Sequence, residues 1–564
     1  MSASRGRKWR LKTANPELQS QLASSLNLSP VIVQLLINRG ITDPAVITSF
    51  LNPSIKDLYD PFLLKDMDKA VIRLQKARDR QETVLVYGDY DVDGVTSTAV
   101  VYRLLKKIGI KAMSYIPHRM DEGYGLNVEI VPLAKQWGVG LLITVDCGIT
   151  AVEEVKALKE AGIDTIVIDH HEPEGVLPHD ACALIDPKQP LCSYPCKDLA
   201  GVGLAAKFVQ SIEGSFPLYD LDLVTLGTIA DVVPIISENR IIVRHGLARI
   251  ASSPKAGLQA LMETACVRGK VMTPHIVGFS LGPRLNAAGR MGSAATSLEL
   301  LLCDDPSNAA ALVEVLEGHN RDRQRKQSAV VDEAVDIIEG AGALSGDRII
   351  VVHKEGWHKG VLGIAASKIV EKYGRPAIVI SVEDGLGVGS ARSVEGFHLN
   401  EALAHCAEML DGFGGHKRAA GLKVKDHMIA DLRARLNSFA VNVFADGIPD
   451  AVIGVDMQLP LGSVGMDLVD LIAMLEPFGE GNPAPVFATR RLLVKSKPQV
   501  MGKDTLKFWV TDGRVSVSVV GFGMAREFGH LRMGQAVDIV YTLGIDDWNK
   551  APQAQIMLKD MRIS

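Results

Sequence analysis

The sequence has 564 residues, which is too long for one compact core and predicts three or four domains at about 150 residues each. A hydrophobic fraction of 47% and a charged fraction of 23% exclude a chain dominated by disorder. The net charge of −5 argues against a protein that coats duplex nucleic acid with a basic surface, so any nucleic-acid contact must be local.

The first 80 residues predict short helices divided by turn-forming strings such as LNLSP and RGITDP. They carry no obvious chemistry, and we expect 1–80 to form an N-terminal helical cap on the domain that follows. From 81 to 306, short β-rich runs alternate with helical patterns, which is typical of βαβ units around a parallel sheet. This segment is predicted to be an α/β catalytic domain.

Polar residues follow each predicted strand of this parallel sheet. In chain order, the strands and the residues that follow them are 84–88 with Asp89, Asp91 and Asp93, 112–117 with His118 and Arg119, 141–145 with Asp146, 165–168 with Asp169, His170 and His171, and 183–185 with Asp186. Ligands of open parallel sheets bind at the carboxyl ends of the strands. We therefore expect these side chains to lie together at one edge of the sheet.

Asp89, Asp91 and Asp93 lie close together between a strand and a helix that we expect to begin at Val95. Three such carboxylates repel one another unless cations neutralise them, which favours a divalent-metal site. The alternative is an acidic cap for the helix, but a single aspartate would suffice for capping.

A carboxylate and two imidazoles come together in Asp169-His170-His171. A histidine pair alone is more often a polar turn, but beside Asp146 and the upstream aspartates it predicts a binuclear metal site. This mixed ligand set suits Mn²⁺ or Mg²⁺ better than zinc. Asp231, in the apolar string GTIADVVPI, is either a helix-end cap or a further ligand. We favour the ligand, because burying a lone carboxylate is costly.

Two metal ions about 3.5–4 Å apart can stabilise both the attacking and the leaving oxygen of a phosphoryl transfer, so the predicted reaction is hydrolysis of a phosphate ester. His171 need not be a ligand, since it could donate a hydrogen bond to a non-bridging phosphate oxygen. Either role places this histidine beside the reacting phosphate.

Three further segments follow the catalytic domain. A helical pattern at 307–340 would extend about 50 Å and is interpreted as a bridging helix with a basic middle. A smaller α/β domain is expected at 341–448, with the glycine-rich strings GVGSARS and GFGGHKRAAG. Evenly spaced β-rich runs predict a small barrel within 449–564.

The apolar runs and the cysteines indicate the cellular location of the protein. Runs such as 141–145 are strand-length, well short of the about 20 residues of a membrane helix, and the basic N-terminus lacks the apolar part of a secretory signal. The seven cysteines are scattered, which favours reduced thiols over a zinc site. We expect a cytoplasmic protein.

In their order along the chain, these motifs resemble the DHH/DHHA1 phosphoesterase superfamily, and within it the single-stranded-DNA-specific 5′→3′ exonucleases of bacteria. The strings that carry the resemblance are YGDYDVDGVTS, HRMDEGYGLN, TVDCGI, IDHHEP, ADVVP, GPRLNAAGRM, GWHKGVLGIAASK, GSARS, GFGGHKRAAG and PFGEGNPAPVF. The resemblance spans roughly 45–564. It implies an α/β protein with a parallel-sheet DHH domain and a smaller α/β DHHA1 domain joined by a long helix, plus a C-terminal β-barrel of the OB-fold type.

The resemblance also implies roles for individual residues. The implied ligands of two Mn²⁺ or Mg²⁺ ions are Asp91, Asp93, Asp146, His170 and Asp231, while the implied residues beside the reaction are Asp89 and His171. The matching candidates for a pocket that binds the terminal 5′-phosphate are Arg119, Arg290, Ser390 and Arg392. This fits the residue types, because a guanidinium binds phosphate bidentately.

Substrate contact is implied for Gly414, Gly415 and His416, although these glycines by themselves predict only a tight turn. A narrow cleft between two α/β domains would admit one strand and exclude a duplex about 20 Å wide. The OB-fold is implied to bind single strands, with Lys507, Phe508 and Trp509 as candidate contacts. Strand alternation points the two aromatic rings to opposite faces, so we expect at least one in the core.

The predicted function is that of a metal-dependent 5′→3′ exodeoxyribonuclease that releases 5′-mononucleotides in DNA recombination and repair, including mismatch repair. We expect a monomer, and the resemblance implies a single-stranded-DNA-binding protein and a helicase as partners. One alternative is a DHH phosphoesterase acting on short oligonucleotides, cyclic dinucleotides or pyrophosphate, against which the barrel and the long helix argue. Another is a non-catalytic DNA-binding scaffold, against which the complete ligand set argues. The direction of attack rests wholly on the resemblance.

Overall fold

The computed structural model describes residues 7–119, 122–173, 175–340, 346–445, 447–546 and 552–563. The chain forms two compact units, each built from segments far apart in the sequence. The barrel unit comprises Met1–Leu58, Val232–Arg244 and Asp450–Ser564, and the two-sheet unit comprises Tyr59–Asp231 and His245–Pro449. Among the described residues, no helix has the length and hydropathy to span a bilayer.

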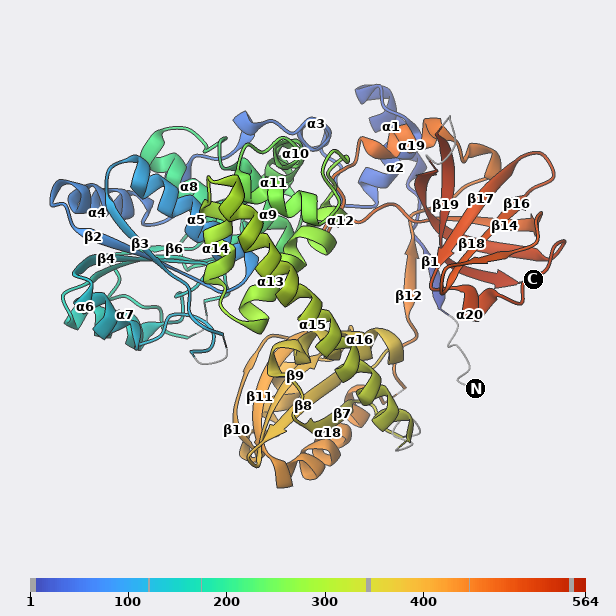
Figure 1. Cartoon of the computed structure of the whole chain (residues 1–564). Coiled ribbons are helices and arrows are strands. Elements are labelled where there is room, and N and C mark those ends of the chain that lie inside the picture. Colours follow the sequence, from blue (N-terminus) through green and yellow to red (C-terminus); the bar gives the residue numbers. More distant parts are fainter. Residues whose placement is uncertain are drawn as a thin grey trace. The chain divides into compact units, whose positions relative to one another are not determined.

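The first sheet of the two-sheet unit holds five parallel strands in the order β3-β2-β4-β5-β6 (Figure 1). In that order they span Lys111–Tyr115, Thr83–Gly88, Val139–Val145, Asp164–Ile168 and Ala183–Ile185. The central strands are buried because helices cover both faces. These helices are α5 (Val92–Lys107) and α8 (Gly201–Glu213) on one face, with α9 (Leu221–Ala230) packed against both, and α6 (Ile130–Gln136) and α7 (Val152–Glu160) on the other face. The predicted parallel sheet is confirmed.

A single helix of 35 residues, α15 (Pro306–Gly340), leads from the first sheet to the second. Val330, Ala334 and Ile338 near its end share a core with the second sheet and with α16 (Leu362–Tyr373). In the second sheet, of order β10-β11-β9-β8-β7, β7 and β8 are parallel and the other neighbours antiparallel. In that order its strands span Leu410–Gly415, Ala419–Lys425, Leu386–Arg392, Ala377–Glu383 and Ile350–Glu355.

The barrel unit is built around strands in the order β13-β14-β18-β19-β17-β16-β15, and an additional pairing of β14 with β16 closes the sheet. In that order the strands span Met457–Gln458, Phe487–Val494, Ala536–Asp546, Gln553–Ile563, Ser516–Phe522, Thr505–Thr511 and Gln499–Met501. On β16, Phe508 is buried in the core whereas Trp509 is 39% exposed. The predicted small barrel and the opposite orientations of these two rings are both confirmed.

The N-terminal helices pack into the core of the barrel unit. Their buried side chains, such as Ile32, share one cluster with barrel residues, such as Phe487, and the helices are α1 (Pro16–Leu26), α2 (Pro30–Ile37) and α3 (Pro44–Leu51). We expected residues 1–80 to cap the domain that follows, and the structure differs. Helix α2 is mostly apolar with five consecutive buried residues, so it needs cover on all sides, which the barrel and the neighbouring helices α1 and α3 supply. The next helix, α4 (Met67–Asp79), belongs to the two-sheet unit.

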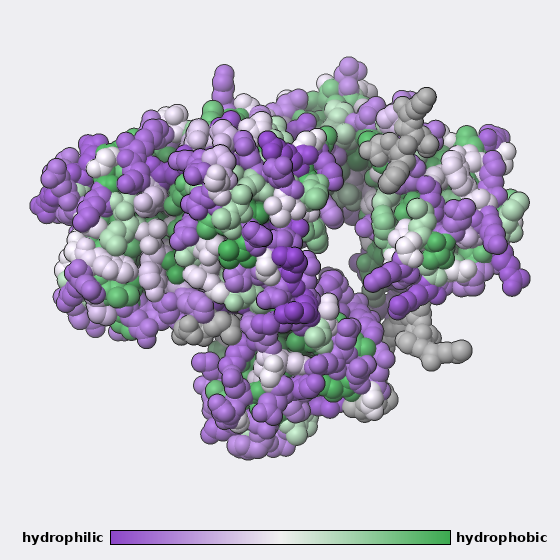
Figure 2. Space-filling model, in the orientation of Figure 1, coloured by the Kyte–Doolittle hydropathy of each residue, from purple (hydrophilic) through white to green (hydrophobic). Residues whose placement is uncertain are grey.

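The surface is mainly hydrophilic on the face drawn in Figure 2, where hydrophobic residues occur in small scattered groups. In the basic middle of α15, the side chains of Arg321 and Arg325 are exposed. Small groups of exposed cations in an acidic protein allow local contacts with a nucleic-acid backbone rather than a continuous basic surface.

Candidate metal centre

The loop after β2 begins helix α5 with one of its three aspartates. Asp91 is the N-cap, and its carboxylate accepts hydrogen bonds from the amides of Asp93 (2.9 Å) and Gly94 (3.1 Å). This cap makes the helix begin at Val92 rather than at Val95, where the apolar pattern predicted it. One aspartate is enough for capping, so the other two carboxylates of the loop need another explanation.

Asp89 and Asp93 are almost completely buried. Asp93 accepts hydrogen bonds from the amides of Gly201 (2.8 Å) and Val202 (2.7 Å) at the N-terminus of α8, where the helix dipole stabilises an anion. One carboxylate oxygen of Asp89 has no hydrogen-bond partner among the described residues. A Cβ on Gly94 would lie 2.4 Å from the backbone oxygen of Asp89, so only glycine lets α5 start this close to it.

Asp146 and Asp231 reach the same place from other elements. Asp146 follows β4 in a left-handed conformation (φ +60°), and its amide donates to the carbonyl of Ile168 at the end of β5 (2.9 Å). A Cβ on Gly201 would lie 2.8 Å from Asp146 Oδ1, so α8 starts directly against this carboxylate. Asp231 is the C-cap of α9, and its carboxylate lies 3.6 Å from His170 Nε2.

The turn after β5 is organised by the Asp169 carboxylate. It accepts hydrogen bonds from the amides of His170 (2.8 Å) and His171 (3.2 Å) and from the amide of Ile149 (2.9 Å). The same carboxylate lies 2.7 Å from His171 Nδ1, while the Tyr124 hydroxyl lies 3.0 Å from His171 Nε2. The imidazole of His171 is therefore held at both ring nitrogens.

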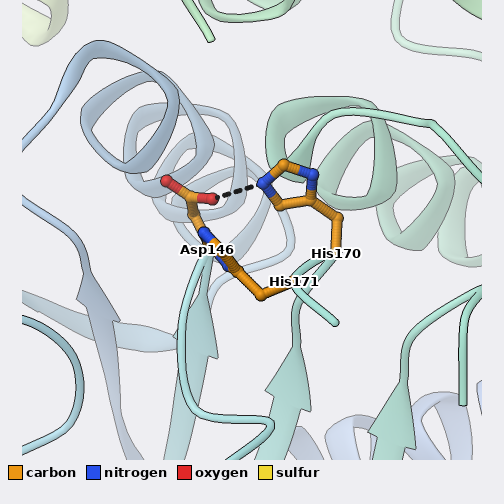
Figure 3. A group of neighbouring side chains, drawn as sticks. All are labelled: Asp146, His170 and His171. Atoms are coloured by element: carbon orange, nitrogen blue, oxygen red, sulfur yellow. Dashed lines mark ion pairs between the residues drawn. The ribbon is translucent and has the colours of Figure 1, made fainter. Parts of the chain in front are cut away.

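The structure brings all seven predicted carboxylates and imidazoles together. Their oxygen and nitrogen atoms lie within 4.8 Å of one another in three groups: Asp89, Asp91 and Asp146; Asp93, His170 and Asp231; and Asp146, His170 and His171. Asp146 and His170 face each other, with Oδ1 and Nε2 3.1 Å apart (Figure 3). Both atoms are buried, and neither has a hydrogen-bond partner among the described residues. Buried ligand atoms that converge in this way without hydrogen bonds fit a divalent cation.

The charges of this cluster also fit bound cations. Burial, followed by the neighbouring aspartates, raises the pKa of Asp146 well above its usual range and that of Asp231 to about 7. Burial lowers the pKa of His170 to about 3, so its imidazole is neutral and can donate a lone pair. Burial opposes protonation of His171, but the Asp169 carboxylate outweighs burial and raises the pKa of His171 to about 9. Crowded carboxylates with one neutral imidazole suit Mn²⁺ or Mg²⁺.

Three arginines and a serine form a cationic cluster in the two-sheet unit. Ser390 and Arg392 lie on β9, and Arg392 Nη1 lies 3.2 Å from Ser390 Oγ. The Arg290 guanidinium donates to the Gly360 carbonyl (3.3 Å), and burial, followed by Arg119, lowers its pKa to about 10. The pKa of Arg392 is likewise lowered by burial and then by Arg119. These guanidiniums are close enough to repel one another, a situation that a phosphate dianion would relieve.

The glycine-rich turn Gly414-Gly415-His416 lies at the end of β10 and is exposed. Gly415 has φ +134°, and a Cβ there would lie 2.5 Å from a backbone oxygen across the turn, so glycine is required. The strand register pairs Gly414 with Gly421 of β11, and Gly421 with Ser390 of β9. The turn therefore lies about 10 Å from Ser390, on the sheet that carries part of the cationic cluster.

Sequence reasoning did not single out Tyr124 and gave Asp169 no separate role. Tyr124 stands in the string HRMDEGYGLN, which was a signal for the loop, but no pattern shows that the loop returns to His171, 47 residues later. The central place of Asp169 depends on the amide of Ile149, which reaches it only through the fold.

Three family models match the chain. The DHH family, N-terminal domain, matches residues 83–228, the DHHA1 domain matches 346–442, and the RecJ OB domain matches 455–560. A relative from Bacillus subtilis, "Single-stranded-DNA-specific exonuclease RecJ", is 38% identical over 99% of this chain and 71% of its own length. The protein of the same name from Haemophilus influenzae is 33% identical over 95% of this chain and 97% of its own length.

Solved structures agree with the sequence comparison. The crystal structure of RecJ from Thermus thermophilus in complex with Mn²⁺ matches with a TM-score of 0.84 and 30% identity, over 98% of this chain and 79% of that chain. The Mg²⁺ complex of RecJ from the same organism matches with a TM-score of 0.78 and 28% identity, over 98% of this chain and 78% of that one. The ions in those crystals are the two that the ligand set described above fits.

Proposed function

Since the chain belongs to the RecJ family of single-stranded-DNA-specific exonucleases, we propose that it degrades single-stranded DNA from the 5′ end and releases 5′-mononucleotides. The chain is an exonuclease that acts on single-stranded DNA with Mn²⁺ or Mg²⁺ as cofactor. The observation that carries the assignment is the convergence of buried carboxylates and a neutral imidazole, in which Asp146 Oδ1 and His170 Nε2 have no hydrogen-bond partner among the described residues. The 5′ start is supported by the family resemblance and by the cationic cluster.

The proposed ligands of two divalent cations are Asp91, Asp93, Asp146, His170 and Asp231, with Asp89 beside them. Bound there, the cations supply positive charge to the attacking and leaving oxygens of an in-line phosphoryl transfer. The protein's own part is to keep the ligands rigid. Backbone amides fix the carboxylates of Asp91 and Asp93, and the left-handed backbone of Asp146 sets the direction of its side chain.

His171 is proposed to donate a hydrogen bond from Nε2 to a non-bridging oxygen of the scissile phosphate. Its neighbour Asp169 holds a proton on Nδ1 and raises the pKa of His171 to about 9 in the metal-free protein, which makes a second proton available on Nε2. Tyr124 bonds to Nε2 in the free protein, so the phosphate would have to take the place of its hydroxyl.

The terminal 5′-phosphate is proposed to bind the cationic cluster of Arg119, Arg290, Ser390 and Arg392. Guanidiniums bind a phosphate dianion through paired, charge-assisted hydrogen bonds. The turn Gly414-Gly415-His416, two strands from Ser390, is proposed to contact the next phosphates along the strand through its exposed backbone. A site that holds the end of a strand explains why an exonuclease starts there.

The wider setting of the enzyme is also proposed from its family. We propose a monomer in the cytoplasm that works in DNA recombination and repair, with a single-stranded-DNA-binding protein and a helicase as partners that provide single strands. We propose 81–306 as the DHH domain, 307–340 as the bridging helix, 341–448 as the DHHA1 domain and 449–564 as the OB-fold domain. The ranges matched by the family models fall inside the three domains.

The test uses 5′-phosphorylated single strands labelled separately at the 5′ and 3′ ends. With Mn²⁺, the 5′ label should appear at once as a mononucleotide, whereas the 3′-labelled strand should shorten step by step. EDTA should stop both reactions, and a blunt duplex of the same sequence should resist. Early release of the 3′ label as a mononucleotide would contradict the proposed direction.

A further inference from the structure

The backbone is strained directly after the proposed ligand Asp231. Val232 has φ +64°, a left-handed conformation that is unfavourable for a β-branched side chain, and the residue is 64% exposed. Such a conformation persists only where the surrounding structure enforces it. An exposed valine has few contacts that could enforce its own conformation. The residues on either side of Val232 must therefore hold it.

The residues after Val232 are held by the 475–482 loop of the barrel unit, to which Val232–Arg244 also belongs. The amide of Ile235 donates to the Glu480 carbonyl at 2.7 Å. A Cβ on Gly479 would lie 2.7 Å from Cγ1 of Ile235, so the loop closes on this turn only because residue 479 is glycine. Residues 477–482 of the loop begin the string PFGEGNPAPVF, which has no role in the site described above.

Arg240 provides a second attachment of the segment Val232–Arg244 to the loop. Its guanidinium is buried and donates to the carbonyls of Leu475 (3.0 Å) and Glu476 (2.9 Å) in the loop, and to the carbonyl of Phe50 (2.9 Å). The guanidinium carbon also lies 3.8 Å from the centroid of the Phe50 ring. The turn is thus bonded at Ile235 and again at Arg240, so it cannot shift without breaking several buried hydrogen bonds.

We propose that the 475–482 loop positions the metal ligand Asp231 by holding the strained turn that follows it. This inference rests on the proposed function, in which Asp231 binds a cation. When the contacts between the loop and the turn are broken, Val232 can relax to a conformation with negative φ. This relaxation rotates the peptide that joins Val232 to Asp231. Gly479 and Arg240 are therefore positioning residues for the metal centre, although neither contacts substrate or metal.

The test measures Mn²⁺ binding to the metal-free, full-length protein by isothermal titration calorimetry, without DNA. Gly479→Ala should weaken binding at least about fivefold, the least effect expected when a strained backbone residue is released. Gly462→Ala is the matched control, because a Cβ at Gly462 meets nothing within 4 Å, and it should bind as the wild type does. Hydrogen exchange should show the amide of Ile235 losing protection in Gly479→Ala only.

A rescue separates positioning from general damage. Val232→Gly, added to Gly479→Ala, should restore most of the Mn²⁺ affinity, because glycine adopts a positive φ without strain. Should Gly479→Ala fail to fold, as judged by circular dichroism, Arg240→Lys takes its place, since it retains the charge but loses the forked hydrogen bonds. Wild-type Mn²⁺ affinity in the folded loop variant would overturn the inference. Wild-type affinity in Asp231→Ala would instead overturn the proposed ligand role.

Discussion

Asp146 belongs to two of the three groups of close ligand atoms, so both proposed cation positions depend on this residue. Asp146→Asn keeps the size of the side chain but removes its charge. We expect turnover on single-stranded DNA at saturating Mn²⁺ to fall at least about 100-fold, as when charge stabilisation of reacting oxygens is lost. Asp180→Asn, an exposed residue of the same domain, should leave turnover unchanged. Full activity of Asp146→Asn would remove this carboxylate from the metal centre.

The pair Asp169–His171 makes the stability of the metal-free protein depend on pH. The pKa of His171 is raised from 6.5 to about 9 in the folded state, so the stabilisation is complete below about pH 6.5 and is lost as the pH rises through about 9. In EDTA, Asp169→Asn should therefore lower the thermal unfolding temperature more at about pH 6 than at about pH 9.5. A difference from wild type that stays constant over this range would show that the ion pair does not form.

At the scale of helices and strands, the sequence predicted what depends on local pattern. The five strands of the first sheet and the long helix α15 follow from apolar runs and from 3.6-residue periodicity, and they are observed within a few residues of their predicted bounds. The start of α5 was missed by three residues, because the capping bonds of Asp91 override the apolar pattern. The placement of α1 to α3 could not be predicted, since their cover comes from strands more than 400 residues away.

The candidate site was likewise predictable only in part. Which side chains meet at the strand ends follows from the parallel order of the strands, and the structure brings all seven together. What the sequence does not show is the support around them: the amides of α8 on Asp93, the hydroxyl of Tyr124 on His171 and the convergence of Arg119 with Arg290. These contacts join loops, and the path of a loop cannot be predicted from the periodicity of the sequence.

The first turn of α16 leaves room for the cationic cluster. A Cβ on Gly363 would lie 2.8 Å from Nη2 of Arg392 and 3.1 Å from Oγ of Ser390. Gly363→Ala should therefore displace the guanidinium and raise KM for 5′-phosphorylated strands about 10-fold, the value of one charge-assisted hydrogen bond, with little change in kcat. Gly318→Ala is the matched control, because a Cβ at Gly318 of α15 would meet nothing within 4 Å. Equal KM values for the two variants would argue against a phosphate pocket at Arg392.

For the whole molecule, the part of the barrel around Trp509 is expected to add affinity for long strands without taking part in cleavage. Trp509 is exposed on β16, and stacking of one base on an aromatic ring contributes about 1–3 kcal/mol. Trp509→Ala should weaken binding of long single strands about 10-fold and leave the turnover of short oligonucleotides unchanged. Met533→Ala, an exposed apolar residue of the same unit, serves as the control. A parallel loss on both substrates would place the tryptophan in the catalytic step.

Deleting residues 450–564 is a poor substitute for that experiment. The deletion would uncover the apolar side chains of α1 to α3, including Ile32 and Leu35, which are fully buried against the barrel. We expect the truncated chain to elute as aggregates in size-exclusion chromatography and to bind a hydrophobic dye, because exposed apolar faces associate. A monodisperse truncated protein that retains its helical circular dichroism would contradict the shared core.

Because the barrel unit is built from three separate segments, it can form only late in synthesis. Leu58 and Asp450 are separated by about 400 residues, which a ribosome adds in roughly 20–80 s at about 5–20 residues per second. During that interval α1 to α3 have no barrel to cover them, so the nascent chain presents an apolar surface of the kind that chaperones bind. A chain released before Asp450 would also carry the carboxylates of the metal centre without the loop that holds Asp231. Unfinished copies of this nuclease would therefore be poor at cutting DNA.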